Sequence, residues 1–108
     1  MSPYFEPQGP GPHDPVALVT AAIEAGAPAV LADEGALPAA FFDLRSGLAG
    51  EVGQRLALYD VAMAAVVADP TAHSGPFQAF VREANRGGLF RFFPVRADAV
   101  AWLEGREA

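Results

Sequence analysis

The sequence has no cysteine, no lysine and no long hydrophobic run. Without cysteine the chain can form no disulfide, no thiolate nucleophile and no thiolate metal site. Its seven basic residues, all arginine, face thirteen acidic ones, and the net charge is −6. This balance argues against nucleic acid and against an anionic membrane surface as partners, because both require a basic face. No apolar run approaches the roughly 20 residues of a membrane-spanning helix.

Apolar residues make up 52% of the 108 positions. A chain of this length has enough apolar surface for one modest core, so we expect a single domain over residues 1–108. Residues 1–13 are rich in proline, which removes backbone donors, and they leave room for at most one short strand around Tyr4–Glu6. The first fifteen residues have neither the basic nor the apolar region of a secretory signal, and we expect a cytoplasmic protein.

Short apolar runs alternate with helical patterns along the chain. The runs typical of buried strands are Ala29–Asp33, Val61–Ala68 and Leu89–Phe93, and the most apolar, Val61–Ala68, is expected at the centre. Capping residues and apolar periodicity predict four helices, three opening after Asp14, Ser46 and Ser74 and a fourth over Asp98–Glu104. With the short N-terminal strand, the predicted fold is α/β, four successive strand–helix units with a mainly parallel sheet.

Residues 34–44 are harder to assign, because Gly35 and Pro38 favour a loop while Phe41, Phe42 and Leu44 must be buried. Either an ordered loop or a short helical turn satisfies both demands.

The turn before the second helix collects polar residues at one end of the predicted sheet. Ligands bind at the carboxyl ends of parallel strands, so we take Asp43, Arg45, Ser46 and Glu51 as candidate residues for binding a partner or ligand. They should form a polar cleft or patch on one side of the molecule. An ion pair between Arg45 and Glu51 would agree with this arrangement. Four acids, Asp33, Glu34, Asp43 and Glu51, lie near this end, and a carboxylate pair for hydrolysis is one interpretation of them. No neighbouring nucleophile or base supports it, and helix caps and solvated acids explain the same residues. We therefore predict no catalytic residue.

Ser46 allows two compatible interpretations. It is a good N-cap for the second helix, a role that contributes about 1 kcal/mol. It is also a candidate phosphoacceptor, because a phosphate there would meet the positive end of the helix and present about two negative charges to a partner.

No metal or cofactor is predicted. His13 and His73 lie in loops without the spacing of metal ligands, and we interpret both as solvated side chains. The glycines from Gly47 to Gly53 do not follow the spacing of a nucleotide-binding loop.

The aromatic content favours self-association. Phe5, Phe90, Phe92, Phe93 and Trp102 are many for one small core, and surplus apolar side chains are often hidden in a symmetric interface. We expect a homodimer through Leu89–Phe93 or the last helix, with Ser46 left accessible.

Two blocks, Phe41–Glu51 and Phe80–Gly87, together with Gln54 and Tyr59, resemble a bacterial family of unknown function, number 4180 in the domain-of-unknown-function series. The resemblance covers roughly residues 14–104.

Ala29–Asp33 followed by Arg45–Gly50 is more distantly similar to STAS domains such as anti-sigma-factor antagonists, in which Asp-Ser-Ser-Gly-Leu-Gly opens a helix after a strand. That likeness implies four strand–helix units and a phosphorylatable serine at Ser46. It implies a non-enzymatic, STAS-like protein-binding regulatory module whose protein partner is unknown. The alternative is a small-molecule-binding protein or an enzyme with its site at the Asp43–Glu51 turn.

Overall fold

The computed structural model describes residues 2–106, so residues 1, 107 and 108 of the expected domain lie outside it. Within residues 2–106 three parallel strands form one sheet in the order β1 (Ala29–Asp33), β2 (Ala62–Val66) and β3 (Phe90–Phe93). The most apolar run is the central strand, as the sequence predicts. Both faces of the sheet are covered, so β1 and β2 each have four of their five residues buried.

Four helices accompany the described strands: α1 (Pro15–Glu24), α2 (Leu48–Tyr59), α3 (Gly75–Ala84) and α4 (Arg96–Gly105). Two of them begin where the capping signals predict. Asp14 accepts a hydrogen bond from the Val16 N–H at 3.0 Å, and Ser74 accepts one from the Phe77 N–H at 3.4 Å. The last helix starts at Arg96, two residues before the predicted Asp98, and has no side-chain cap.

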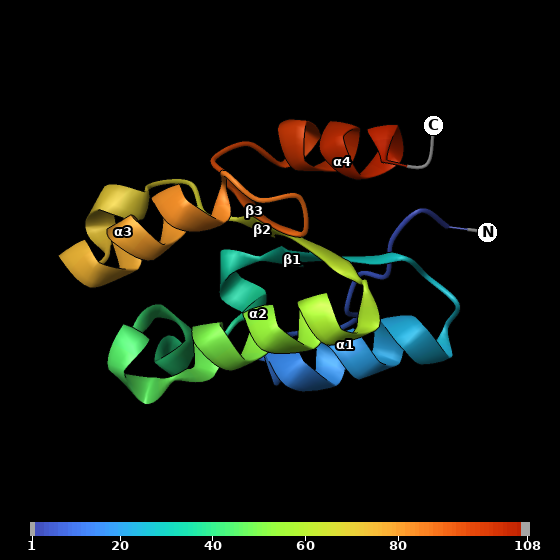
Figure 1. The fold of residues 1–108 in the computed structure, drawn as a ribbon, viewed down its shortest axis with the longest axis horizontal. Coiled ribbons are helices and arrows are strands. Elements are labelled where there is room, and N and C mark those ends of the chain that lie inside the picture. Colours follow the sequence, from blue (N-terminus) through green and yellow to red (C-terminus); the bar gives the residue numbers. More distant parts are fainter. Residues whose placement is uncertain (1, 107–108) are drawn as a thin grey trace.

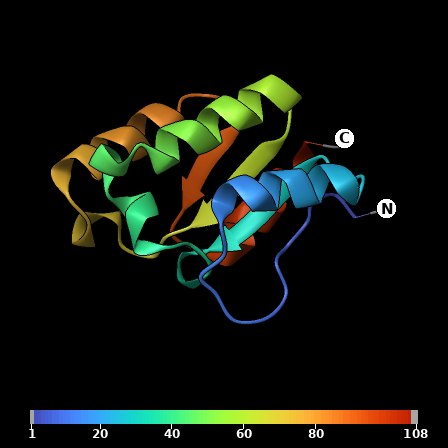
Figure 2. The ribbon, with the colours of Figure 1, turned by 90° about the horizontal axis from the view of Figure 1, so that it is seen from below.

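The helices lie on the two faces of the sheet (Figure 1). α1 and α2 run side by side below it, as Figure 2 also shows, and the buried side chains of α3 join the same core. α2 links β1 to β2 and α3 links β2 to β3, and both helices lie on the same face of the sheet. The two crossovers therefore have the same hand, as the right-handed rule for parallel strands requires. α4, which no described strand follows, covers the opposite face.

The two cores differ in the size of their side chains. The larger one, under α1, α2 and α3, contains Phe41, Phe77, Phe90 and Phe92, with Phe41 and Phe77 ring centroids 6.1 Å apart. The smaller one packs α4 against alanines of β1 and β2 through Ala99 and Leu103. The small strand residues allow α4 to approach the sheet closely.

The first of the four predicted strand–helix units is not confirmed. Instead of a strand over Tyr4–Glu6, the N-terminal segment forms one parallel bridge between Phe5 and Val30. The Phe5 N–H donates to the Ala29 carbonyl at 2.7 Å, and the Leu31 N–H donates to the Phe5 carbonyl at 2.9 Å. Pro3 and Pro7 limit the pairing to this bridge, because a proline has no N–H to donate to a sheet.

Residues 34–46 form three short 3-10 turns, which resolves the choice left open by the sequence in favour of helical turns. These are η1 (Glu34–Ala36), η2 (Ala39–Phe42) and η3 (Leu44–Ser46). η2 places Phe41 in the core with no exposed surface, so the segment is anchored between β1 and α2. None of the described helices has both the length and the apolar character needed to cross a membrane.

Candidate functional site

Ser46 lies at the junction between η3 and α2, one residue before the N-cap of the helix. The N-cap is Gly47, whose φ of 79° lies in the left-handed region that favours glycine. The Ser46 Oγ nevertheless accepts from the Leu48 N–H at 3.2 Å and donates to the Ala40 carbonyl at 2.6 Å. The predicted cap position is therefore wrong by one residue, but the exposed hydroxyl still bonds a free N–H of α2 and ties η2 to it.

Asp43 and Arg45 meet beside Ser46. The Asp43 Oδ1 accepts from the Arg45 N–H at 3.1 Å and lies 3.5 Å from the Arg45 Nε. The two side chains are 53% and 93% exposed, so their ion pair contributes at most about 1 kcal/mol. The described ion pairs of Arg45 do not include Glu51, an exposed residue in the first turn of α2.

A cleft of about 290 Å³ lies next to this turn. Its lining residues are Asp43, Leu44, Arg45, Ser74 and Pro76. The cleft thus lies between η3, the turn before α2, and the beginning of α3, whose N-terminal end favours negative charge. Two of the four candidate residues, Asp43 and Arg45, line it, while Ser46 and Glu51 do not belong to the lining.

His73, which the sequence suggested to be solvated, is bonded and mostly buried, so that interpretation is wrong. Its Nε2 lies 2.8 Å from Glu34 Oε2, and its side chain is only 18% exposed. The ring stacks on Phe42, with centroids 4.4 Å apart and planes 9° from parallel. A carboxylate that fixes one imidazole nitrogen leaves the other, Nδ1, to act as a base or ligand.

His13 is not fully solvated either. Its Nε2 is buried and has no hydrogen-bond partner among the described residues, while its backbone N–H donates to the Ala36 carbonyl at 2.8 Å. η1 thus contacts both histidine-bearing loops through Glu34 and Ala36. Within residues 2–106 no group of three or more His, Asp or Glu side chains has the geometry of a metal site.

A charged cluster at the same edge of the sheet joins three distant segments. Arg96, the first residue of α4, donates to both carboxylate oxygens of Glu6 at 2.7 Å and lies 3.5 Å from Asp33 Oδ2. The hydrogen bonds from Arg96 are the largest influence on the pKa of Glu6 and lower it, against the smaller effect of burial. The cluster clamps the N-terminal segment to the end of β1 and the start of α4.

The sequence alone does not reveal the Glu34–His73 pair or the Arg96 cluster. Glu34 is 39 residues from His73, and Glu6 is 90 residues from Arg96. One signal in the sequence pointed toward these contacts. Asp33 and Glu34 lie at the end of a predicted strand, where segments distant in sequence converge.

Comparison with known proteins places the chain in a family and gives no further relative. The searches of curated proteins and of solved structures found no match. A family model described as Domain of unknown function (DUF4180) matches residues 11–103, nearly the whole chain. The chain therefore belongs to the DUF4180 family of domains of unknown function.

Proposed function

We propose that this domain is a protein-binding regulatory module without catalytic activity, and that it presents its partner surface at the start of α2. The observation that carries the proposal is the setting of Ser46. Its hydroxyl is exposed, and its hydrogen-bond partners among the described residues are backbone groups of Ala40 and Leu48. A serine nucleophile in catalysis needs a neighbouring side-chain base, whereas a phosphoacceptor needs access.

Phosphorylation of Ser46 would change both its bonding and its charge. The phosphate oxygen has no hydrogen to donate, so the 2.6 Å bond to the Ala40 carbonyl would be lost. The phosphate would still accept from the Leu48 N–H, which belongs to the positive end of α2. About two negative charges would be added beside the Asp43–Arg45 pair, and a partner sensitive to charge would respond.

The STAS-like part of the proposal rests on the position of this helix start. Ser46–Gly47–Leu48 opens α2 at the edge of the sheet where β1 ends, and in anti-sigma-factor antagonists a serine before a glycine opens a helix after a strand. The intervening turns η1, η2 and η3 are an addition to that pattern.

Partner capture from the source cell tests the proposal. We would compare the wild type with Ser46→Asp and Ser46→Ala, using Thr20→Asp as a control that adds the same charge on the exposed surface of α1. Ser46→Asp should alter the set of captured proteins, Ser46→Ala should retain the unmodified set, and Thr20→Asp should behave as the wild type. Mass spectrometry of the protein from the same cell should find phosphate on Ser46. Identical partners for all variants, with no phosphate on Ser46, would contradict the proposal.

The homodimer expected from the aromatic content stays a prediction, but fewer aromatic side chains need an interface to cover them. Phe90 and Phe92 are 7% and 5% exposed, so the chain's own core accommodates them. The Phe92 N–H, on the outer side of β3, already donates to Asn85 Oδ1 at 2.7 Å. A contact through α4 is therefore favoured over strand pairing through β3, and light scattering decides between monomer and dimer.

The second candidate function is small-molecule binding or catalysis at the Asp43–Glu51 turn. The Glu34–His73 pair favours it, because a carboxylate that orients an imidazole is the arrangement of a general base. Phe42 and His73 directly precede two residues that line the cleft, Asp43 and Ser74. Native mass spectrometry of the purified protein tests this candidate: a small molecule retained by the wild type and lost from His73→Gln would support it over the first.

A further inference from the structure

Trp102 lies between elements that bring two guanidinium groups to its ring. The Cζ of Arg91, in β3, is 5.6 Å from the ring centroid, and the Cζ of Arg106, just after α4, is 5.0 Å from it. Both distances are within the range of cation–π attraction. The Phe93 ring adds apolar surface 5.7 Å from Trp102. We call these residues the Arg91–Trp102–Arg106 cluster.

The two guanidinium groups are held in place by backbone carbonyls of the turn between α3 and β3. Arg91 Nε donates to the Gly87 carbonyl at 2.9 Å, and Arg106 donates to the Gly88 carbonyl. A side chain fixed before binding loses less entropy when a ligand arrives. Each guanidinium has five N–H donors, so most of them stay available.

Among residues 2–106, neither arginine of the cluster forms an ion pair with an acid. The ion pairs of the described residues involve Arg45, Arg86 and Arg96 but neither Arg91 nor Arg106. The surrounding segment is also the basic part of an acidic chain. Residues 82–106 contain five of the seven arginines but only three of the thirteen acidic residues.

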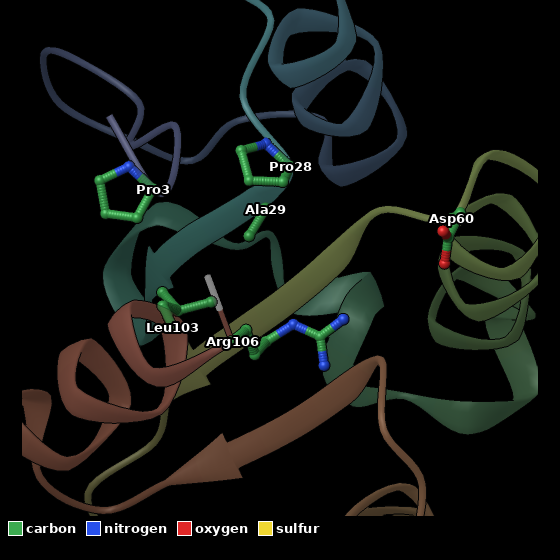
Figure 3. A pocket seen from close by; sticks show the side chains of 6 residues that line it. All are labelled: Pro3, Pro28, Ala29, Asp60, Leu103 and Arg106. Carbon is green, nitrogen blue, oxygen red and sulfur yellow. The ribbon is translucent and has the colours of Figure 1, made fainter. Parts of the chain in front are cut away.

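A cavity of about 370 Å³ begins at the same end of α4 (Figure 3). Figure 3 shows Arg106 on its wall, together with Leu103 of α4 and Pro28 and Ala29 at the start of β1. Pro3 and Asp60 complete the lining, and Asp60 is its one acidic residue. This is the edge at which the strands begin, whereas Ser46 lies at the edge where they end. The cluster is therefore separate from the surface assigned to Ser46, and the two can be tested independently.

We propose that the Arg91–Trp102–Arg106 cluster is a docking site for an acidic segment of a partner protein. Carboxylates of that segment would accept hydrogen bonds from Arg91 and Arg106, while its backbone and methylene groups pack on Trp102. Arginine and tryptophan are the residues that most often dominate binding energy in protein interfaces, and the guanidinium group matches a carboxylate with two parallel hydrogen bonds.

The charges disfavour two other occupants. A homodimer through another face of α4 is compatible with this site, but a second copy that docked symmetrically on the cluster would bring the guanidinium groups of both copies together, which costs energy. Nucleic acid would be repelled at long range by the net charge of −6. The same net charge also repels an acidic peptide, but a short segment carries fewer charges than a nucleic acid, so its repulsion is smaller.

The only tryptophan of the chain is Trp102, so intrinsic tryptophan fluorescence reports on this cluster alone. We would titrate the full chain with a short polyglutamate peptide at low salt, and a polyglutamine peptide would serve as the uncharged control. A saturable change with polyglutamate is expected, and added salt should weaken it because the pairs are near the surface. Arg91→Gln and Arg106→Gln should each weaken binding roughly tenfold, which corresponds to about 1.4 kcal/mol.

Arg55→Gln is the matched control. Arg55 is exposed on α2, on the other side of the sheet, and its replacement removes the same charge. It should leave the affinity unchanged. Arg106 is exposed and lies outside the helices and strands, so Arg106→Gln should fold even if Arg91→Gln, which changes a residue of β3, does not. The test therefore does not depend on the Arg91 variant alone.

Three outcomes would overturn the proposal. Polyglutamate could leave the fluorescence of Trp102 unchanged, or Arg55→Gln could weaken binding as much as Arg91→Gln, which would indicate general charge attraction. Tighter binding of oligothymidylate than of polyglutamate would assign the cluster to nucleic acid. A doubling of mass in light scattering, with a fluorescence change that depends on protein concentration alone, would assign it to a second copy.

Discussion

Replacing Arg96 with glutamine should destabilise the protein at neutral pH and have much less effect in acid. Arg96 clamps the N-terminal segment through two hydrogen bonds of 2.7 Å to the carboxylate of Glu6, and it lies 3.5 Å from Asp33. Glutamine removes the charge and the paired geometry. The Phe5–Val30 bridge, which directly precedes Glu6, would then hold the segment with less support.

The size of the effect follows from exposure and geometry. The side chains of Arg96 and Glu6 are 46% and 31% exposed, so solvent screens much of their attraction. Exposed ion pairs contribute up to about 1 kcal/mol, and the two-point geometry favours the upper end. We therefore expect a loss of about 1 kcal/mol, or about 4 °C in the melting temperature of a domain of this size.

The pH dependence has a definite sign. Because Arg96 lowers the pKa of Glu6, the folded protein binds the Glu6 proton less readily than the unfolded chain does. The resulting stability is present above the unfolded pKa of about 4.3 and is lost as the pH falls through the lower, folded pKa. The difference between the wild type and Arg96→Gln should shrink in that acidic range.

Thermal unfolding followed by circular dichroism at neutral pH and at about pH 3 measures both effects. Arg86→Gln is the control, because its pair with Glu83 is 3.5 Å long and more than three-quarters exposed on both sides. Adding Glu6→Gln to Arg96→Gln should cost little more than Arg96→Gln alone. An equal loss of stability at both pH values would refute the reasoning, and so would a control that melts as low as Arg96→Gln.

Three further predictions concern the framework of the fold. Phe41→Ala should cost about 3–5 kcal/mol in urea unfolding, since the ring is fully buried among four other phenylalanines. Ser74→Ala should cost about 1 kcal/mol in the same assay, because it removes the cap of α3. Asp60→Gly should have the opposite sign and raise the melting temperature slightly, since Asp60 ends α2 with a φ of 55° that glycine adopts without strain. A destabilised Asp60→Gly protein would contradict the strain argument.

Much of the secondary structure was determined by the sequence alone, because its signals are local. The strands Ala29–Asp33 and Phe90–Phe93 lie within the predicted runs, and Asp14 and Ser74 cap the helices that they were expected to cap. Each signal depends on a few neighbouring residues, either a side chain that bonds the next turn or a run that needs cover on both faces. The parallel sheet then followed, since strands separated by helices have no other short connection.

Tertiary structure decided which side chains meet at the ends of those strands. The sequence placed Asp43, Arg45 and Ser46 together because they are neighbours along the chain, but not His73 with Glu34 or Arg96 with Glu6. It also overestimated the N-terminal strand, which is a single bridge between prolines. Such contacts depend on the paths of segments 39 and 90 residues apart, and no local pattern encodes a distance between them. Only the packing of the helices on the sheet brings these groups within hydrogen-bond reach.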